Sequence, residues 1–288
     1  MLCAPTSAER MPMNEEVRLS RSRVSRRRAL ALGGVVGLSG VLTACAGAGG
    51  PPSGGAATSA AVVTDPAALL DVANTCILAK DGPQGPYWFD VDSIRSDIRD
   101  GRPGLALALA LRVHDVSSCS VGGPVTPVRD AVVEIWHCDA GGVYSGFAAA
   151  RADERSGASG PSRETSDGAY SRGEPEARPT DGAEYLRGAQ AVDPDGIVRF
   201  TTIYPGWYVG RTTHIHCKVH LDRTTVLTTQ LYFDDNLTDE VYLLPPYVEH
   251  VTRDTRNDTD PLYDDVGLMT TQRSADGCLA AVNLGVDL

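Results

Sequence analysis

Residues 203–219 read IYPGWYVGRTTHIHCKV, and this stretch predicts both a strand and a site. Its last six residues, 214–219, alternate polar and apolar side chains as a half-buried β-strand does, so His214 and His216 are expected on one face. Two imidazoles two residues apart on a strand can coordinate one metal ion. The alternative is an ordinary pair of surface or hydrogen-bonded histidines.

The turn before this strand supplies further candidate ligands. Pro205 and Gly206 favour a turn that can swing Tyr208 or Tyr204 over the histidine face. A phenolate suits a hard, highly charged ion better than zinc, which prefers nitrogen and sulfur. Cys217 falls on the opposite face of the strand, so we expect it to be a buried packing residue.

Elsewhere the chain contains several short segments in which polar and apolar residues alternate as in β-strands. Gly, Pro and Asp turns separate them, and helical periodicity is almost absent. This pattern predicts an all-β fold with an antiparallel β-sandwich core, long loops and little helix. The expected strands are 105–113, 132–137, 197–203, 214–220 and 225–233, with one short helix at 66–73 and a terminal segment around Cys278 that packs back on the sandwich.

The last two expected strands predict a pairing register. If Leu221, Asp222 and Arg223 form a simple hairpin loop, His214 lies opposite Gln230. Gln230 then lies beside the proposed metal on the same face. The alternative is a solvent-facing strand glutamine.

The front of the chain has the composition of an export signal. Arginines at 26–28 precede an uncharged run, 29–44, that is too short for a membrane span. We therefore assign residues 1–45 to a twin-arginine signal with a lipobox ending at Cys45, the expected lipid anchor. The alternative is an ordinary cleavable signal. The expected location is outside the cytoplasm, as a cell-surface or periplasmic lipoprotein or a released extracellular protein.

Two segments follow this signal. Residues 46–67 are expected to form a flexible tether, because 46–60 contain only Ala, Gly, Pro, Ser and Thr. Residues 68–288 are expected to form the sandwich domain. Within it, 148–184 has almost no apolar residues; it is either disordered or a lid, and its composition favours disorder.

Charge and motifs exclude several function classes. Without residues 1–44, which carry seven Arg and three Glu, 19 basic and 34 acidic side chains remain, a net charge of −15. Nucleic acid and anionic membrane surfaces are therefore poor partners, and neutral substrates are favoured over anionic ones. The sequence has no Gly-rich phosphate loop, Gly-x-Ser-x-Gly elbow or His-Glu-x-x-His motif, which disfavours nucleotide, common hydrolase and zinc peptidase chemistry.

Five cysteines lie beyond the signal. In an oxidising exterior we expect one or two disulfides and one leftover thiol, and two pairs chosen from five cysteines allow fifteen arrangements. These cysteines are Cys76, Cys119, Cys138, Cys217 and Cys278.

Three separated motifs together resemble those of the intradiol ring-cleavage dioxygenases. They are 85–87, Gly-Pro-Tyr; 132–145, VVEIWHCDAGGVYS; and 205–216, PGWYVGRTTHIH. The resemblance extends over about 76–265 and is to the exported branch rather than to the cytosolic catechol and protocatechuate enzymes. It implies a dioxygenase that uses O2 to cleave a catechol between its two hydroxyl-bearing carbons, giving a muconate-type diacid.

The resemblance also implies a non-haem Fe(III) cofactor and its ligands. Tyr144 matches the equatorial tyrosinate and Tyr208 the axial one, while His214 and His216 match the histidine ligands. Tyr208 is also implied as the base that takes the second substrate proton.

Two further residues carry implied roles. Arg211 matches the arginine that stabilises negative charge on the substrate ring, and Gln230 matches a glutamine near the iron. Tyr204 is not at a ligand position and is expected to be a packing residue, and His137 is expected to be a structural hydrogen-bonding residue.

Two departures from the family leave questions open. Only five residues separate Tyr208 from His214, fewer than in the cytosolic enzymes, so the identity of the catechol stays open. The family's helical dimerisation segment is not evident, so an oligomer is compatible with the sequence but its form is not predicted. The rival hypothesis is a non-catalytic exported lipoprotein that binds metal or aromatics on the same scaffold.

Overall fold

The computed structural model describes residues 64–288 except 74, 121–122, 149–160, 251–252 and 275. The predicted export signal, residues 1–45, and the predicted tether up to residue 63 lie outside the described residues. Of the expected short helix at 66–73, only the 3₁₀ helix η2, Pro66–Leu69, forms, with the side chain of Asp65 accepting a hydrogen bond from Ala67 N. Among the described residues no helix is long and apolar enough to cross a membrane.

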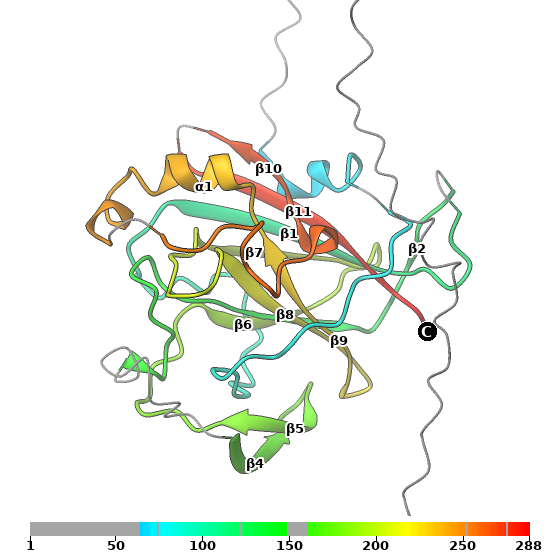
Figure 1. Ribbon diagram of the computed structural model, residues 1–288. Helices are drawn as coiled ribbons and strands as arrows, with labels where there is room; N and C mark the ends of the chain where they lie inside the picture. Colours follow the sequence, from blue (N-terminus) through cyan, green and yellow to red (C-terminus); the bar gives the residue numbers. More distant parts are fainter. Residues whose placement is uncertain (1–63, 74, 121–122, 149–160, 251–252, 275) are drawn as a thin grey trace, which may run out of the picture. The chain divides into compact units, whose positions relative to one another are not determined.

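The described chain is built mainly from strands arranged in two larger sheets (Figure 1). Its one α-helix, α1, is Asp235–Val241, and two further 3₁₀ helices are η4, Tyr247–Glu249, and η5, Asp265–Gly267. The first sheet contains β1 (Ala106–Asp115), β2 (Thr126–Pro127), β7 (Ile197–Ile203), β10 (Thr270–Arg273) and β11 (Cys278–Val286). The second contains β3 (Val132–Trp136), β6 (Arg187–Ala191), β8 (His214–Leu221) and β9 (Thr224–Tyr232).

The core lies between these sheets, as the alternating pattern predicts. From β1, Leu107, Leu109, Leu111 and Val113 are fully buried and belong to one cluster with side chains of β3, β8 and β9. Burying each such side chain contributes about 2 kcal/mol. The all-β sandwich predicted from the sequence is confirmed, and Cys217 is buried in this core as expected.

The opposite face of β1 is covered as well, which the single-face prediction did not include. Ala110 on that face packs with Leu69 and Leu70 of the η2 segment and with Ala281. The small alanines on that face leave room for the short helix.

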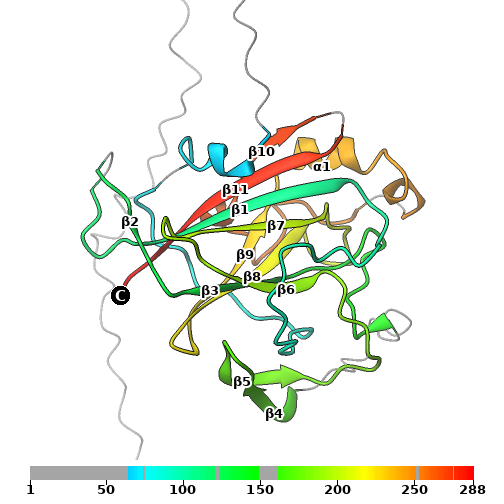
Figure 2. The same cartoon turned by 180° about the vertical axis from the view of Figure 1, so that it is seen from behind.

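Strand pairing is antiparallel except between β1 and β11. These two central strands run parallel over Leu107–Asp115 and Cys278–Val286, and β11 also pairs antiparallel with β10. Figure 2 shows β11 between β10 and β1 from behind. The terminal segment with Cys278 therefore packs back on the sandwich, as predicted, but as an inner strand.

The favoured prediction of disorder for 148–184 is wrong for the part that the structure describes. Residues 161–184 contain the antiparallel pair β4, Pro161–Asp167, and β5, Arg172–Ala177. Polar contacts replace a hydrophobic core here: Glu174 accepts from Lys218 Nζ at 3.3 Å, and Ala177 N donates to Trp88 O at 2.7 Å. Composition alone could not reveal these partners, because they lie far away in the sequence.

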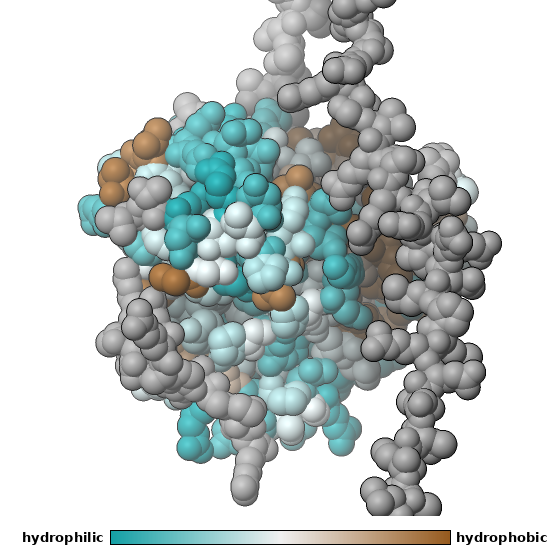
Figure 3. Space-filling view, viewed as in Figure 1, coloured by the Kyte–Doolittle hydropathy of each residue, from teal (hydrophilic) through white to brown (hydrophobic). Residues whose placement is uncertain are grey.

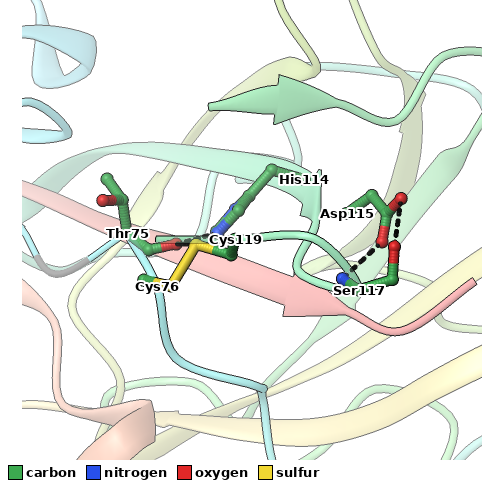
Figure 4. Close-up of a disulfide and its surroundings, with 6 residues drawn as sticks. All are labelled: Thr75, Cys76, His114, Asp115, Ser117 and Cys119. Carbon is green, nitrogen blue, oxygen red and sulfur yellow. Dashed lines mark hydrogen bonds between the residues drawn. A yellow bond between two sulfur atoms is a disulfide. The ribbon is translucent and has the colours of Figure 1, made fainter. Parts of the chain in front are cut away.

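One disulfide, Cys76–Cys119, forms among the described residues, with its Cα atoms 5.7 Å apart (Figure 4). It joins the segment before β1 to the loop after it. Cys138, Cys217 and Cys278 are unpaired and buried, so the expectation of a single leftover thiol is wrong. Each of these three sulfur atoms lies against a backbone carbonyl rather than another sulfur atom.

Hydrophilic residues cover much of the surface around α1, with small hydrophobic groups scattered between them (Figure 3). Exposed apolar side chains include Leu243, Val248 and Val209. Single exposed apolar residues of this kind are common on soluble domains.

Candidate active site

The two histidines of β8 point away from the sandwich core, on the outer face of the second sheet. His214 is 2% exposed and His216 is 1% exposed, so the strand expected to be half-buried is buried on both faces. Segment 84–89 and β5 cover the outer face. For example, Gly85 lies so close to His216 that an added Cβ would be 3.1 Å from its ring.

The register predicted for Gln230 is wrong by two residues. Gln230 lies opposite His216, and Tyr232 lies opposite His214. The turn contains only Asp222 and Arg223, both with positive φ, which shifts the pairing by one residue. A β-bulge near His220 shifts it by another. Because two shifts preserve the alternation of faces, Gln230 still lies on the histidine side.

A tight turn after β3 brings Tyr144 to the same place. The Asp139 carboxylate accepts hydrogen bonds from Gly141 N at 2.9 Å and Val143 N at 3.0 Å, which folds the chain back on itself. Gly142 adopts φ +81° and an added Cβ would be 2.1 Å from Trp207 O. Only glycine allows this turn to pack directly on the segment that carries Tyr208.

Four donor atoms meet where these segments converge. His214 Nε2 lies 3.2 Å from Tyr208 Oη, 3.4 Å from Tyr144 Oη and 3.2 Å from His216 Nε2. The Nδ1 atom of His214 lies 2.6 Å from Thr212 O, so the hydrogen is on Nδ1 and the lone pair of Nε2 faces the other three atoms. The structure therefore brings together the four predicted ligand side chains.

Burial keeps this cluster uncharged in the absence of a cation. It lowers the pKa of His214 to about 3, with Arg211 adding to the effect, and lowers the pKa of His216 well below its ordinary value. It also raises the pKa of both Tyr144 and Tyr208. At neutral pH the site therefore holds two neutral imidazoles and two protonated phenols. A multiply charged cation would favour loss of the two phenol protons.

The donor set fits a hard, highly charged metal ion. Ligand atoms about 2.0–2.2 Å from one ion stand about 3 Å apart, close to the separations seen here. In the described part of the chain no group of three or more His, Cys, Asp or Glu could hold a metal, so a metal at this place has to use the phenol oxygens. Phenolate and imidazole together suit iron better than zinc.

Arg211 and Gln230 lie beside the cluster and bind each other. Arg211 Nη2 donates to Gln230 Oε1, and Gln230 Nε2 donates to Pro83 O at 3.1 Å. Arg211 Nε donates to Asp260 Oδ2 at 2.9 Å. The cationic guanidinium thus lies close enough to Tyr208 and His214 to lower the pKa of both side chains electrostatically.

Aromatic rings enclose the cluster on other sides. Tyr87 stacks on Tyr144 with ring centroids 4.7 Å apart, and Trp136 stacks on His216 at 4.9 Å. Tyr208 and Arg211 are half-buried, whereas Tyr144, His214 and His216 are buried.

Sequence reasoning missed Asp260, Trp136 and Tyr232 as neighbours of the site. Tyr232 Oη lies 3.2 Å from Gln230 Oε1 and 2.7 Å from Leu262 O. The pairing of His214 with Tyr232 would have followed from a correct register. No local pattern marks Asp260, which lies in a loop-rich segment.

The two residues expected to have structural roles are buried and hydrogen-bonded outside the cluster. Tyr204 is fully buried and its hydroxyl lies 2.8 Å from Thr238 Oγ1. His137 is buried between Cys138 O and Thr202 Oγ1, each 2.8 Å from one ring nitrogen. Neither side chain is among the four that meet at the cluster.

The chain is similar in sequence and fold to known dioxygenases. A family model described as Dioxygenase matches residues 85–255. An intradiol ring-cleavage dioxygenase from Tetranychus urticae is 27% identical, with a TM-score of 0.60, covering 74% of this chain and 95% of that one. The dioxygenase domain of a carbohydrate-binding fusion protein from Streptomyces sp. SirexAA-E is 25% identical, with a TM-score of 0.49, covering 74% and 99%. Among curated protein sequences no match was found.

Proposed function

Because this chain belongs to the intradiol ring-cleavage dioxygenase family, we propose that it cleaves a catechol between its two hydroxyl-bearing carbons with dioxygen. The observation that carries the proposal is that two phenol oxygens and a second imidazole nitrogen, His216 Nε2, lie within 3.4 Å of His214 Nε2. A binding module would need neither two tyrosines in this set nor an arginine beside it.

Fe(III) would be held by Tyr144, Tyr208, His214 and His216. When bound, a ferric ion would supply Lewis acidity that favours the doubly deprotonated catechol. The two phenolates would balance most of its charge, and the remaining roles fall to side chains of this chain.

Tyr208 is suited to move a proton. It is the one half-buried member of the four, and its Oη lies 3.2 Å from His214 Nε2. Its phenol pKa is raised by burial, so the Tyr208 phenolate would be a strong base. We propose that Tyr208 Oη is the base that accepts the proton of the second substrate hydroxyl.

Arg211 is suited to stabilise charge on the substrate ring. Its guanidinium is held at Nε and Nη2 by protein acceptors, so its position is fixed before substrate binds. A preorganised cation at the place where negative charge develops lowers the barrier by about 3 kcal/mol.

The catechol and O2 together account for all atoms and electrons of the overall reaction. The bond between the two hydroxyl-bearing carbons breaks, both atoms of O2 enter the product, and each of the two carbons becomes a carboxyl carbon. Catechol is oxidised and dioxygen is reduced, so no further electron donor is needed. The net acidic character of the chain favours a neutral catechol over an anionic one.

Purified protein loaded with iron should be coloured, because ferric phenolates absorb visible light. Oxygen uptake with a panel of catechols, followed by product identification, should give one muconate-type diacid per O2 consumed. A colourless, zinc-loaded protein that consumes no oxygen with any catechol would refute the proposal.

We also propose that the chain is exported and anchored by a lipid on Cys45. The support is the sequence alone: the arginines at 26–28, the uncharged run that follows and the small residues before Cys45. Replacing Arg26 and Arg27 by Lys should leave the protein in the cytoplasm. Radiolabelled fatty acid should label the wild-type protein but not a Cys45→Ala variant; equal labelling would refute the anchor.

A further inference from the structure

A buried carboxylate outside the region matched by the family model lies directly behind Arg211. Asp260 lies between α1 and η5, beyond residue 255, where the match ends. Its side chain is fully buried, at 0% exposure. A buried carboxylate is costly unless several donors satisfy it, so its partners are informative.

Three N–H groups satisfy Asp260. Its Oδ2 accepts from Arg211 Nε and from Thr212 N, both at 2.9 Å, and its Oδ1 accepts from Leu262 N at 2.8 Å. One carboxylate oxygen therefore fixes both the guanidinium and the backbone immediately before β8.

The other side of the guanidinium is fixed as well. Arg211 Nη2 donates to Gln230 Oε1, and Gln230 is itself held by Pro83 O and the Tyr232 hydroxyl. In the described part of the chain Nη1 of Arg211 has no hydrogen-bond partner, and 14% of the side chain is exposed. One edge of the guanidinium is thus left for a ligand.

We propose that Asp260 is a positioning residue that aims Arg211 at the substrate ring. An arginine side chain has several rotatable bonds, and without a partner at Nε it would sample many orientations. Asp260 limits it to one, at the edge of the four-atom cluster. The inference rests on the proposed function, because it assigns Asp260 a part in the same reaction.

Asp260 also supports the start of β8. Thr212 N donates to Asp260, and Thr212 O lies 2.6 Å from His214 Nδ1. A purely structural role would act through this second connection and would not depend on Arg211. The two roles can therefore be separated by removing Arg211.

The test is a double-mutant cycle on the iron-loaded protein with Asp260→Ala, Arg211→Ala and the pair. We expect Asp260→Ala to lower kcat about 30-fold and Arg211→Ala about 300-fold. If Asp260 acts through Arg211, the double variant should be within about 3-fold of Arg211→Ala. The Asp260→Ala variant should keep the iron content and the visible spectrum of wild type. Its affinity for 4-nitrocatechol, measured without oxygen, should stay within about 3-fold of wild type.

Asn257 provides a matched control in the same segment. It accepts a hydrogen bond from Thr212 Oγ1 at 2.7 Å, and it is uncharged. Asn257→Ala should leave kcat within about 3-fold of wild type. If Asp260→Ala does not fold, Asp260→Asn, which has the same shape, takes its place in the cycle, with an expected loss of about 10-fold.

Three outcomes would overturn the inference, and they differ. Losses that multiply in the double variant would mean that Asp260 acts independently of Arg211, and an unchanged kcat in the Asp260 variant would remove its role; both leave the proposed function intact. Wild-type protein that is iron-loaded yet inactive with every catechol would overturn the proposed function together with this inference.

Discussion

At the level of single residues, the two histidines of the cluster are oriented by different means. His214 is fixed by its Nδ1 contact with Thr212 O. His216 Nδ1 has no hydrogen-bond partner among the described residues, and its ring is instead held by stacking on Trp136 and by the close approach of Gly85. The position of His216 thus depends on packing, which makes it sensitive to small changes in volume.

Tyr144→Phe should remove most of the bound iron and most of the visible colour, because it deletes one of the two phenol oxygens. Iron analysis and an absorption spectrum of the purified variant measure this. Full colour with unchanged turnover would contradict a ligand role for Tyr144.

Tyr204→Phe is the control for this variant. Tyr204 is equally buried, and its hydroxyl meets Thr238 instead of the cluster. It should keep wild-type colour and lose only about 1 kcal/mol of stability, the usual contribution of one hydrogen bond.

His137 should make the fold sensitive to acid. Burial lowers the pKa of His137 to about 4, from 6.5 for an ordinary histidine. Between these values the unfolded chain binds a proton that the folded chain does not, so the free energy of unfolding falls as pH is lowered. At pH 4.5 this effect is on the order of 2 kcal/mol.

Urea unfolding of wild type and His137→Gln at pH 7 and pH 4.5 measures this effect. The variant should be less stable at pH 7, because it loses the paired hydrogen bonds of His137. Its loss of stability on acidification should be smaller by roughly 2 kcal/mol. Equal losses in the two proteins would show that His137 does not cause the acid sensitivity.

At the level of elements, the turn at Gly85 should control the geometry of the cluster. Gly85 has φ +77° and contacts the His216 ring, whereas Gly101 has φ +72° and nothing within 4 Å of an added Cβ. Both Gly→Ala changes should cost about 1–2 kcal/mol of stability from the backbone conformation. Only Gly85→Ala should also reduce iron content and kcat, and equal behaviour of the two variants would contradict this.

The strands could be predicted from the sequence because alternation and turn residues are local signals. Segments 197–203 and 214–220 match β7 and β8 almost to the residue. The pairing of β8 with β9 could not be predicted to the residue, since a bulge leaves no mark in the sequence pattern. The β4–β5 pair was missed for a related reason: it is stabilised by polar contacts with distant residues such as Lys218.

The four side chains of the cluster could be predicted because they lie in compact motifs with characteristic spacing. Asp260 could not, because its importance arises only from the three-dimensional path that carries it back to Arg211 and Thr212. The same holds for Trp136, whose ring meets His216 across two paired strands.

For the molecule as a whole, the Cys76–Cys119 disulfide should contribute a large part of the stability. It joins cysteines 43 residues apart, and closing a loop of that length removes unfolded-state entropy worth about 4 kcal/mol. A Cys76→Ala, Cys119→Ala double variant should unfold at a correspondingly lower urea concentration. Its kcat at 25 °C should match that of wild type. Loss of activity in a variant that is fully folded would show that the disulfide also supports the site.

The central position of β11 has a consequence for biosynthesis. One hydrogen-bonding edge of β1 waits for residues 278–286, so the sandwich stays open until those residues have left the ribosome. Completion of the fold would then have to follow translation rather than accompany it. A nonsense codon that removed β11 would leave every other strand of the sandwich intact, yet its product should fail to complete the first sheet and be degraded.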